Sequence, residues 1–174
     1  MENVTLYRNI AELKSINMFY FDTKTEERPT ILCLHGRWGR AATWVDFMKH
    51  YGKQYRVIAP DQRGHGLSDK PIAKYTTEEM SSDIIELLNH LKIDSIILVG
   101  HSMGGTIAGY LAAMHPEYVT AVAILDKSAA GPAKLNMLPP DQISTIDPLT
   151  KDWPLPFTSL SEAMSFIKVR LIRS

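Results

Sequence analysis

Short apolar runs alternate with helix-like stretches along the middle of this chain, and this alternation limits its possible folds more than any other feature. The runs at 30–34, 56–59, 95–99 and 119–125 are almost wholly apolar, which is typical of strands covered on both faces. Between them, apolar residues recur at helical spacing: Trp44, Phe47, Met48 and Tyr51, then Met80, Ile84, Leu87, Leu88 and Leu91, then Ile107, Leu111 and Met114. This order predicts an α/β fold built on a mostly parallel sheet with helices on both faces.

The two ends of the chain differ from this middle part. Two short strands are expected first, near 4–9 and 15–21, and Thr76 with Glu79 fits a capping box at the start of the second helix. Residues 128–158 are rich in Pro, Ser, Thr and Asp, and Ser159 with Glu162 fits the start of a further helix. We therefore expect residues 1–127 to form the sheet domain and residues 128–174 to leave the sheet.

The composition indicates an ordinary globular protein without net charge. Nineteen basic and nineteen acidic side chains leave no net charge, so nothing favours nucleic acid or an anionic membrane as a partner. Cys33 is the one cysteine, so no disulfide can form within the chain and a reducing compartment fits. We see no signal peptide at the N-terminus and no apolar run long enough to cross a membrane, and we expect a cytoplasmic protein.

The segment Gly100-His-Ser-Met-Gly104 matches the pattern G-x-S-x-G between a predicted strand and a predicted helix. A sharp, strained turn at that point presents the hydroxyl of Ser102 outside the packed layers, and glycine on either side avoids collisions with neighbouring elements. The start of the following helix adds partial positive charge near a developing oxyanion. The alternative is a glycine-rich turn that only permits close helix packing.

Two more glycine-containing loops follow predicted strands. The first, His35-Gly-Arg-Trp-Gly39, lets a backbone N–H approach the serine turn, so the N–H groups of Arg37 and Met103 are candidates for an oxyanion hole. Its His35 fits a structural histidine that bridges loops better than a catalytic one. The second loop, 61–69, fits a tight, internally hydrogen-bonded structure, and it lacks the Gly-Lys-Ser/Thr of a phosphate loop.

The segments HGRWG, DQRGHGLSD and GHSMGG, in this order and spacing, resemble the α/β-hydrolase superfamily. The similarity is greatest to its small esterases, lactonases, haloperoxidase-type enzymes and thioesterases with a helical cap. This resemblance implies a Ser102 nucleophile, an oxyanion hole from Arg37 and Met103, and a cap that begins near residue 130. Gly36, Trp38 and His101 are then candidates for substrate binding. Serine at position 102 departs from the aspartate of dehalogenases and epoxide hydrolases of this fold.

A serine nucleophile needs a base, and in this fold the chain order is serine, acid, histidine. The six histidines are at positions 35, 50, 65, 90, 101 and 115, so only His115 follows Ser102, and it ends the next helix. His101 adjoins Ser102, but neighbours at a sharp turn are expected to point apart. Asp126 is a candidate for the acid, with a structural role as the alternative. We therefore expect a hydrolase shortened at its C-terminus, weak or inactive by itself, with an uncovered sheet edge that promotes self-association.

Three functions remain open at this point. The first is a serine hydrolase that acts on a small carboxylic ester, lactone or thioester through a Ser102 acyl-enzyme. The second is a non-catalytic protein that binds a ligand or partner on a hydrolase scaffold. The third is half of a split or swapped enzyme whose histidine comes from another chain. No cofactor or metal is indicated, because the chain has no cysteine cluster and no His-x-x-x-His pair.

Overall fold

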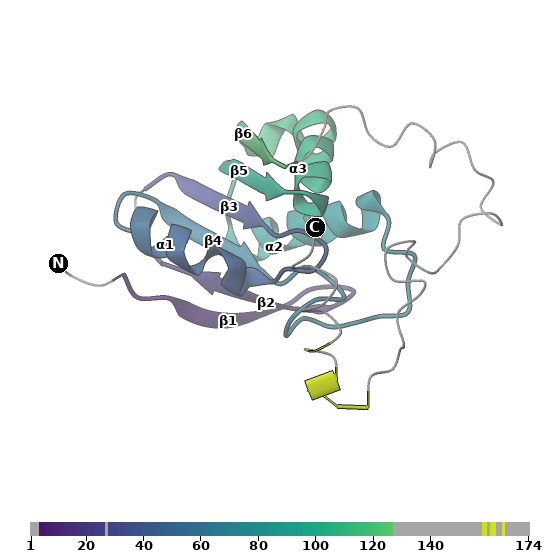
Figure 1. Cartoon of the computed structure of the whole chain (residues 1–174). Coiled ribbons are helices and arrows are strands. Elements are labelled where there is room, and N and C mark those ends of the chain that lie inside the picture. Colours follow the sequence, from purple (N-terminus) through teal and green to yellow (C-terminus); the bar gives the residue numbers. More distant parts are fainter. Residues whose placement is uncertain (1–3, 27, 127–157, 160, 163–164, 166–174) are drawn as a thin grey trace. The chain divides into compact units, whose positions relative to one another are not determined.

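A computed structural model of the chain describes residues 4–26, 28–126, 158–159, 161–162 and 165. Its described strands form one six-stranded sheet in the order β1-β2-β4-β3-β5-β6 (Figure 1). The strands are β1 (Tyr7–Glu12), β2 (Asn17–Asp22), β3 (Thr30–Leu34), β4 (Arg56–Pro60), β5 (Ile96–His101) and β6 (Val119–Leu125). The helices are α1 (Val45–Tyr51), α2 (Thr77–Leu91) and α3 (Met103–Met114), with 3-10 turns at Ala41–Trp44 and Pro116–Tyr118. The predicted α/β fold class is confirmed.

The sheet is parallel where the glycine-containing motifs lie and antiparallel at its other end. Strands β4, β3, β5 and β6 are parallel neighbours, whereas β1 pairs antiparallel with β2, and β2 pairs antiparallel with β4. Leu32 of β3 lies opposite Ile58 of β4 on one side and Leu98 of β5 on the other. Because parallel strands end at the same edge, the loops after β3, β4, β5 and β6 meet there, as ligand-binding loops do in such sheets.

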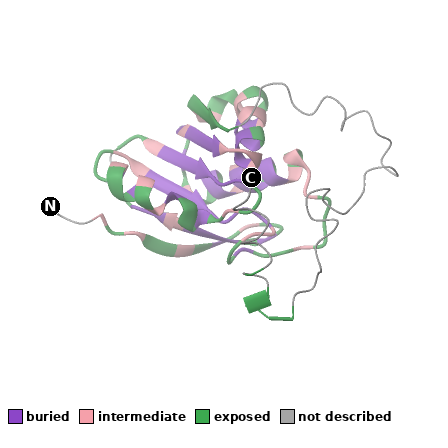
Figure 2. Ribbon diagram, viewed as in Figure 1, coloured by how far each residue is buried: buried purple, intermediate pink, exposed green. Residues whose placement is uncertain are grey.

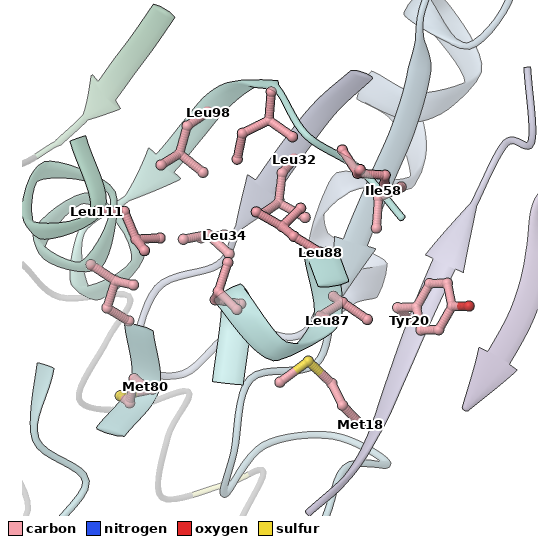
Figure 3. Packing of buried hydrophobic residues seen from close by; sticks show 14 of the residues in the cluster. Met18, Tyr20, Leu32, Leu34, Ile58, Met80, Leu87, Leu88, Leu98 and Leu111 are labelled. Carbon is pink, nitrogen blue, oxygen red and sulfur yellow. The ribbon is translucent and has the colours of Figure 1, made fainter. Parts of the chain in front are cut away.

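Alternate residues of the central strands face two separate cores. One core joins Leu32, Leu34, Ile58 and Leu98 to α2 and α3 through residues that include Ile84, Leu87, Leu88, Ile107 and Leu111 (Figure 3). The other joins Ile31, Cys33, Val57, Ala59 and Val99 to Met48 of α1 and to Trp44 of the preceding 3-10 turn. Each fully buried Leu or Ile stabilises the fold by about 1.5–3 kcal/mol, so this double coverage explains the continuous apolar runs.

The first strand was predicted three residues too early, and the second was predicted to start two residues and end one residue too early. Both faces of β2 are covered, because Met18 packs in the first core and Phe19 in the second. An interior strand of this kind has no polar alternation to mark its ends. On the edge strand β1, Ile10 is 64% exposed, which blurs the pattern further.

The predicted capping box at the start of α2 is confirmed. The Thr76 hydroxyl accepts a hydrogen bond from the Glu79 N–H over 3.2 Å, and the Glu79 carboxylate accepts one from the Thr76 N–H over 3.0 Å. The helix ends at Lys92, whose φ of 55° breaks the helical geometry. Both ends of α2 are thus fixed by local contacts.

Strand β6 is the exposed edge of the described sheet. Every residue of β6 after Val119 is exposed, with Val122, Ile124 and Leu125 each more than two-fifths accessible (Figure 2). No strand in the described part of the chain pairs with its outer side. The expected sheet edge is therefore open over residues 4–126.

The chain divides into two units, Met1–Ser128 and Ala129–Ser174. In the second unit, Ser159 accepts a hydrogen bond from the Glu162 N–H over 3.1 Å, as the sequence predicted for a helix start. The predicted cap, residues 128–174, lies almost entirely outside the described residues, and its assignment stays a prediction. None of the helices described is long and apolar enough to cross a membrane.

Candidate active site

Ser102 occupies a strained turn between β5 and α3. Its φ of 49° and ψ of −110° lie in a region that side-chain-bearing residues seldom adopt. The turn makes Ser102 the residue that caps α3, and the side chain is half-buried rather than packed in a core. Such strain persists only where surrounding contacts hold it, and it is typical of functional sites. The predicted sharp strand-to-helix turn is present.

The two glycines of the motif are required by close packing. A Cβ on Gly100 would lie 2.3 Å from the carbonyl oxygen of Gly104, and one on Gly104 would lie 2.3 Å from that of Leu34. Both distances are shorter than any real contact, and both partners are backbone atoms that cannot swing away. The glycines therefore let β3, β5 and α3 approach closely enough to fix the serine turn.

The loop after β3 lies directly against this turn. A Cβ on Gly36 would meet the His101 ring at 2.8 Å and the Ser102 Cβ at 3.4 Å. The predicted substrate-binding residues Gly36 and His101 are thus next to the candidate nucleophile. Trp38, in the same loop, is 52% exposed. His101 and Ser102 both approach Gly36, so the two neighbours do not point fully apart as the sequence had suggested.

Two groups orient the peptide that carries the Arg37 N–H. The Gly36 carbonyl accepts hydrogen bonds from His35 Nδ1 over 2.8 Å and from the Gly39 N–H over 2.9 Å. A trans peptide is planar, so the Arg37 N–H points away from the Gly36 carbonyl and away from its two donors. The candidate oxyanion donor is thereby fixed in direction before any substrate arrives.

His35 is a fully buried, neutral bridge between two loops. Its Nε2 accepts a hydrogen bond from the Gln62 N–H over 3.0 Å, and the Gln62 side chain donates to its carbonyl over 2.8 Å. Nδ1 must therefore carry the ring proton that goes to Gly36. Burial, with a smaller effect of the nearby His65, lowers the pKa of His35 to about 4, although the hydrogen bond to Gly36 acts in the opposite direction. This is the bridging role that the sequence favoured for His35.

Met103, the second candidate oxyanion donor, is the first residue of α3. The N–H groups of a first helical turn have no acceptor within the helix. The first intrahelical bond of the turn runs from the Thr106 N–H to the Ser102 carbonyl over 3.1 Å. The Met103 N–H is therefore available at the positive end of the helix, beside Ser102.

The loop after β4 is organised by the buried carboxylate of Asp61. Asp61 accepts hydrogen bonds from the Ala41 N–H over 2.5 Å and from the Leu67 N–H over 2.7 Å. A Cβ on Gly66 would collide with that carboxylate at 1.9 Å. Arg63 makes a two-pronged ion pair with Asp83 of α2, at 2.5 and 2.7 Å. The predicted internally hydrogen-bonded loop is observed.

One residue of this loop escaped sequence reasoning. The ring of His65 contacts the carbonyl of Arg37 through Nε2 and the carbonyl of Arg63 through Nδ1, the latter at 2.9 Å. It also lies edge-on to His35, with 4.9 Å between ring centroids. Its position between Gly64 and Gly66 was the only hint in the sequence.

The described residues supply no evident base for Ser102. His50 and His90 are exposed at the C-terminal ends of α1 and α2. His115 and Ser102 lie at opposite ends of α3. His35 and His65 use both ring nitrogens on backbone groups. That leaves His101, whose Nε2 lies 3.6 Å from a carboxylate oxygen of Asp126.

Asp126 follows β6 with a φ of 51° and is 86% exposed. The structure brings it to His101 rather than to a histidine that faces Ser102. A group of three or more His, Cys, Asp and Glu side chains suited to a metal ion is absent from the part of the chain described.

Comparison with known proteins agrees with this geometry. The chain matches the family model of the alpha/beta hydrolase fold over residues 29–159. Epoxide hydrolase 1 of Caenorhabditis elegans is 34% identical over 110 residues, which are 62% of this chain and 27% of that protein. The crystal structure of a bacterial membrane phospholipase A superposes with a TM-score of 0.70 at 30% identity, over 74% of this chain and 42% of that one.

A third similar protein is Est816, described as an N-acyl homoserine lactone degrading enzyme. It superposes with a TM-score of 0.63 at 32% identity, over 67% of this chain and 44% of its own. The present chain thus spans less than half the length of each of these three proteins. The match over residues 29–159, with the serine turn and its loops in place, shows that the chain belongs to the α/β-hydrolase fold family of enzymes.

Proposed function

We propose that this chain carries the nucleophile and oxyanion hole of a serine hydrolase that acts on small carboxylic esters, lactones or thioesters. One observation carries the proposal: Ser102 is held at a φ of 49° between Gly100 and Gly104, and a Cβ at either glycine would collide with backbone atoms. A protein that only binds a ligand has no need of this strain. The similarity to a lactone-degrading enzyme and to a phospholipase supports the same class of bond.

The proposed reaction starts with attack of the Ser102 Oγ on the carbonyl carbon of the substrate. The carbonyl oxygen becomes an oxyanion that accepts hydrogen bonds from the N–H groups of Arg37 and Met103. When the tetrahedral intermediate collapses, the bond to the leaving alcohol, lactone oxygen or thiol breaks, and an acyl-enzyme remains. Water then attacks the acyl carbon and regenerates Ser102.

The proton of Ser102 has to be taken by a base, and the proton must later reach the leaving group. Five of the six histidines lie away from Ser102 or use both ring nitrogens on backbone groups, and the described contact of His101 is to Asp126 rather than to the Ser102 hydroxyl. In this proposal the base is a histidine outside these 174 residues, on a longer form of the protein or on a partner chain. Asp126 then holds His101 instead of acting as the acid.

Serine at position 102 also separates this proposal from epoxide opening, the activity named for one relative. Attack of a serine hydroxyl on an epoxide carbon would form an ether. An ether has no carbonyl carbon for water to attack, so the enzyme could not be regenerated. An ester or lactone leaves an acyl group that water can remove.

The other parts of the site follow from this assignment. Gly36, Trp38 and His101 would contact the substrate beside Ser102, and no metal or cofactor is needed for acyl transfer. We place the reaction in the cytoplasm, with a small acyl compound and no nucleic acid as its partner. The lone, buried Cys33 and the zero net charge support this.

The test is acylation by excess p-nitrophenyl acetate, followed by mass spectrometry of the intact chain. We expect a slow, single acetylation that maps to Ser102 and is lost in Ser102→Ala. Ser95→Ala, an exposed serine that precedes β5, is the matched control and should acetylate as the wild type does. Acetylation that persists unchanged in Ser102→Ala would refute the proposal.

A further inference from the structure

His65 connects the two loops that border the candidate oxyanion hole. Its backbone is fixed within the loop after β4, because its N–H donates to the Gln62 carbonyl over 3.0 Å and its carbonyl accepts from the Ser68 N–H over 3.2 Å. From this fixed position the ring reaches the Arg37 carbonyl, 28 residues earlier in the chain. Arg37 is the residue whose N–H is proposed to bind the oxyanion.

The partners of the two ring nitrogens are both acceptors. Nδ1 faces the Arg63 carbonyl at 2.9 Å and Nε2 faces the Arg37 carbonyl at hydrogen-bonding distance. A neutral imidazole has one donor and one acceptor, so it satisfies only one of two carbonyls. The imidazolium has two donors and satisfies both. The geometry therefore suits the protonated ring, and the neutral ring would leave a lone pair facing a carbonyl oxygen.

We propose that His65 is a proton-dependent latch on the loop after β3. The protonated ring holds the Arg37 carbonyl, and the ring releases this carbonyl when it loses a proton. The contact to Arg63 is only two residues away and is kept by the chain itself, so the contact between loops is the one that opens. The Gly36–Arg37 peptide is then still held through the Gly36 carbonyl, which accepts from His35.

The groups around the ring are compatible with a positive charge. From the loop after β3 it faces His35, which is neutral because burial lowers its pKa to about 4, and Arg37 through its carbonyl. From its own loop it faces Arg63 through its carbonyl, and the carboxylate of Asp61 and the ammonium of Lys70 both lie against the adjacent Gly66. The guanidinium of Arg63 is turned away to Asp83, so its charge is compensated there.

The latch is tested without any enzyme activity, by NMR of the 15N-labelled 174-residue chain between pH 5 and 8.5. We expect the His65 ring at low pH to show protons on both nitrogens, and the backbone amides of Arg37 and Trp38 to shift with the same midpoint as the ring. A His65 ring that is a single neutral tautomer throughout this range would overturn the proposal. So would a titrating ring whose midpoint the Arg37 and Trp38 amides do not follow.

Two variants identify the histidine responsible. In His65→Gln the pH-dependent shift of these amides should disappear, because glutamine does not titrate. His101 also lies beside the loop, against Gly36, so His101→Gln is the matched control and should retain the shift with its midpoint unchanged. If His65→Gln does not fold, the wild-type titration and the His101→Gln control still decide between the two histidines.

The consequence for catalysis rests on the proposed function and has a separate readout. If Arg37 binds the oxyanion, His65→Gln should slow acetylation of Ser102 at saturating p-nitrophenyl acetate about tenfold, with little change in the half-saturating concentration. If NMR shows the latch but the acetylation rate is unchanged, Arg37 is not part of the oxyanion hole and the latch proposal stands. No titrating contact by NMR would reject the latch and leave the hydrolase proposal untouched.

Discussion

The backbone N–H of Ser102 donates a hydrogen bond to the carbonyl of Leu125 over 2.9 Å. The candidate nucleophile is therefore fixed from two sides, by its own strand β5 and by the end of the next strand, β6. Leu125 also lies opposite His101 in the β5–β6 pair, and Asp126 follows it. The end of β6 thus sets both the serine backbone and the His101 contact.

Replacement of Gly104 by alanine should destabilise the chain. The new Cβ would meet the Leu34 backbone at 2.3 Å, and overpacking of this kind costs about 1–3 kcal/mol. Urea unfolding measures the effect. Gly109→Ala in the same helix is the matched control, because its Cβ would meet only the Ile124 side chain at 3.7 Å. The control should be neutral or stabilising by up to about 1 kcal/mol, since alanine is the better helix former. Equal losses in both variants would contradict the close-approach argument.

The strain at Ser102 can be measured by comparing two variants that both lack its hydroxyl. Ser102→Gly should be more stable than Ser102→Ala by about 1 kcal/mol, because glycine adopts a φ of 49° without the cost that a Cβ imposes there. Thermal unfolding of the two proteins side by side tests this. The idea fails if the alanine variant is equally stable or more so.

The carboxylate of Asp61 should be among the most sensitive positions outside the cores. Asp61→Ala leaves the N–H groups of Ala41 and Leu67 without their acceptor, at a cost of about 1–3 kcal/mol for each that stays buried. Chemical denaturation gives the loss, with Asp46→Asn, at an exposed position of α1, as a control that should change little. A small loss in Asp61→Ala would mean that the loop finds other acceptors.

Stability should fall in mild acid because of His35. Its pKa is lowered from 6.5 to about 4 in the folded chain, so between these values the unfolded chain binds a proton that the native chain does not. The free energy of unfolding therefore rises with pH across this window, and about 3 kcal/mol is lost as pH falls from 7 to 4. His35→Gln should flatten the profile, whereas exposed His90→Gln should not. A wild-type profile without a slope between pH 6.5 and 4 would contradict the neutral, buried His35.

We also propose that the exposed edge strand β6 drives self-association of this chain. Among the described residues the outer edge of β6 is unpaired, and its exposed Val122, Ile124 and Leu125 make it a template for pairing with a second copy. Light scattering after size exclusion should show a mass that rises with concentration and falls in Ala123→Lys, which places a charge on the strand. Ala113→Lys, exposed on α3, controls for the added charge. A monomer at every concentration would rule this out.

Most of the sheet and the serine turn could be predicted from the sequence because local patterns encode them. The runs 30–34 and 119–125 match β3 and β6 to the residue, and the glycines around Ser102 mark the turn by themselves. The role of His65 could not be predicted, because it depends on how two loops 28 residues apart meet. The His101–Asp126 contact likewise depends on the pairing of β5 with β6.

The loop that holds His65 is joined to β2, the second strand of the chain. Asn17 of β2 exchanges hydrogen bonds with Asp69, the Phe19 N–H donates to the Ser68 hydroxyl over 2.9 Å, and the Asp61 N–H donates to the Phe19 carbonyl over 2.8 Å. Strand β2 is therefore part of the support that holds this loop. Loss of the first twenty-two residues would therefore affect the site indirectly. The serine motif would keep its sequence, but the loop beside it would lose the hydrogen bonds that β2 provides.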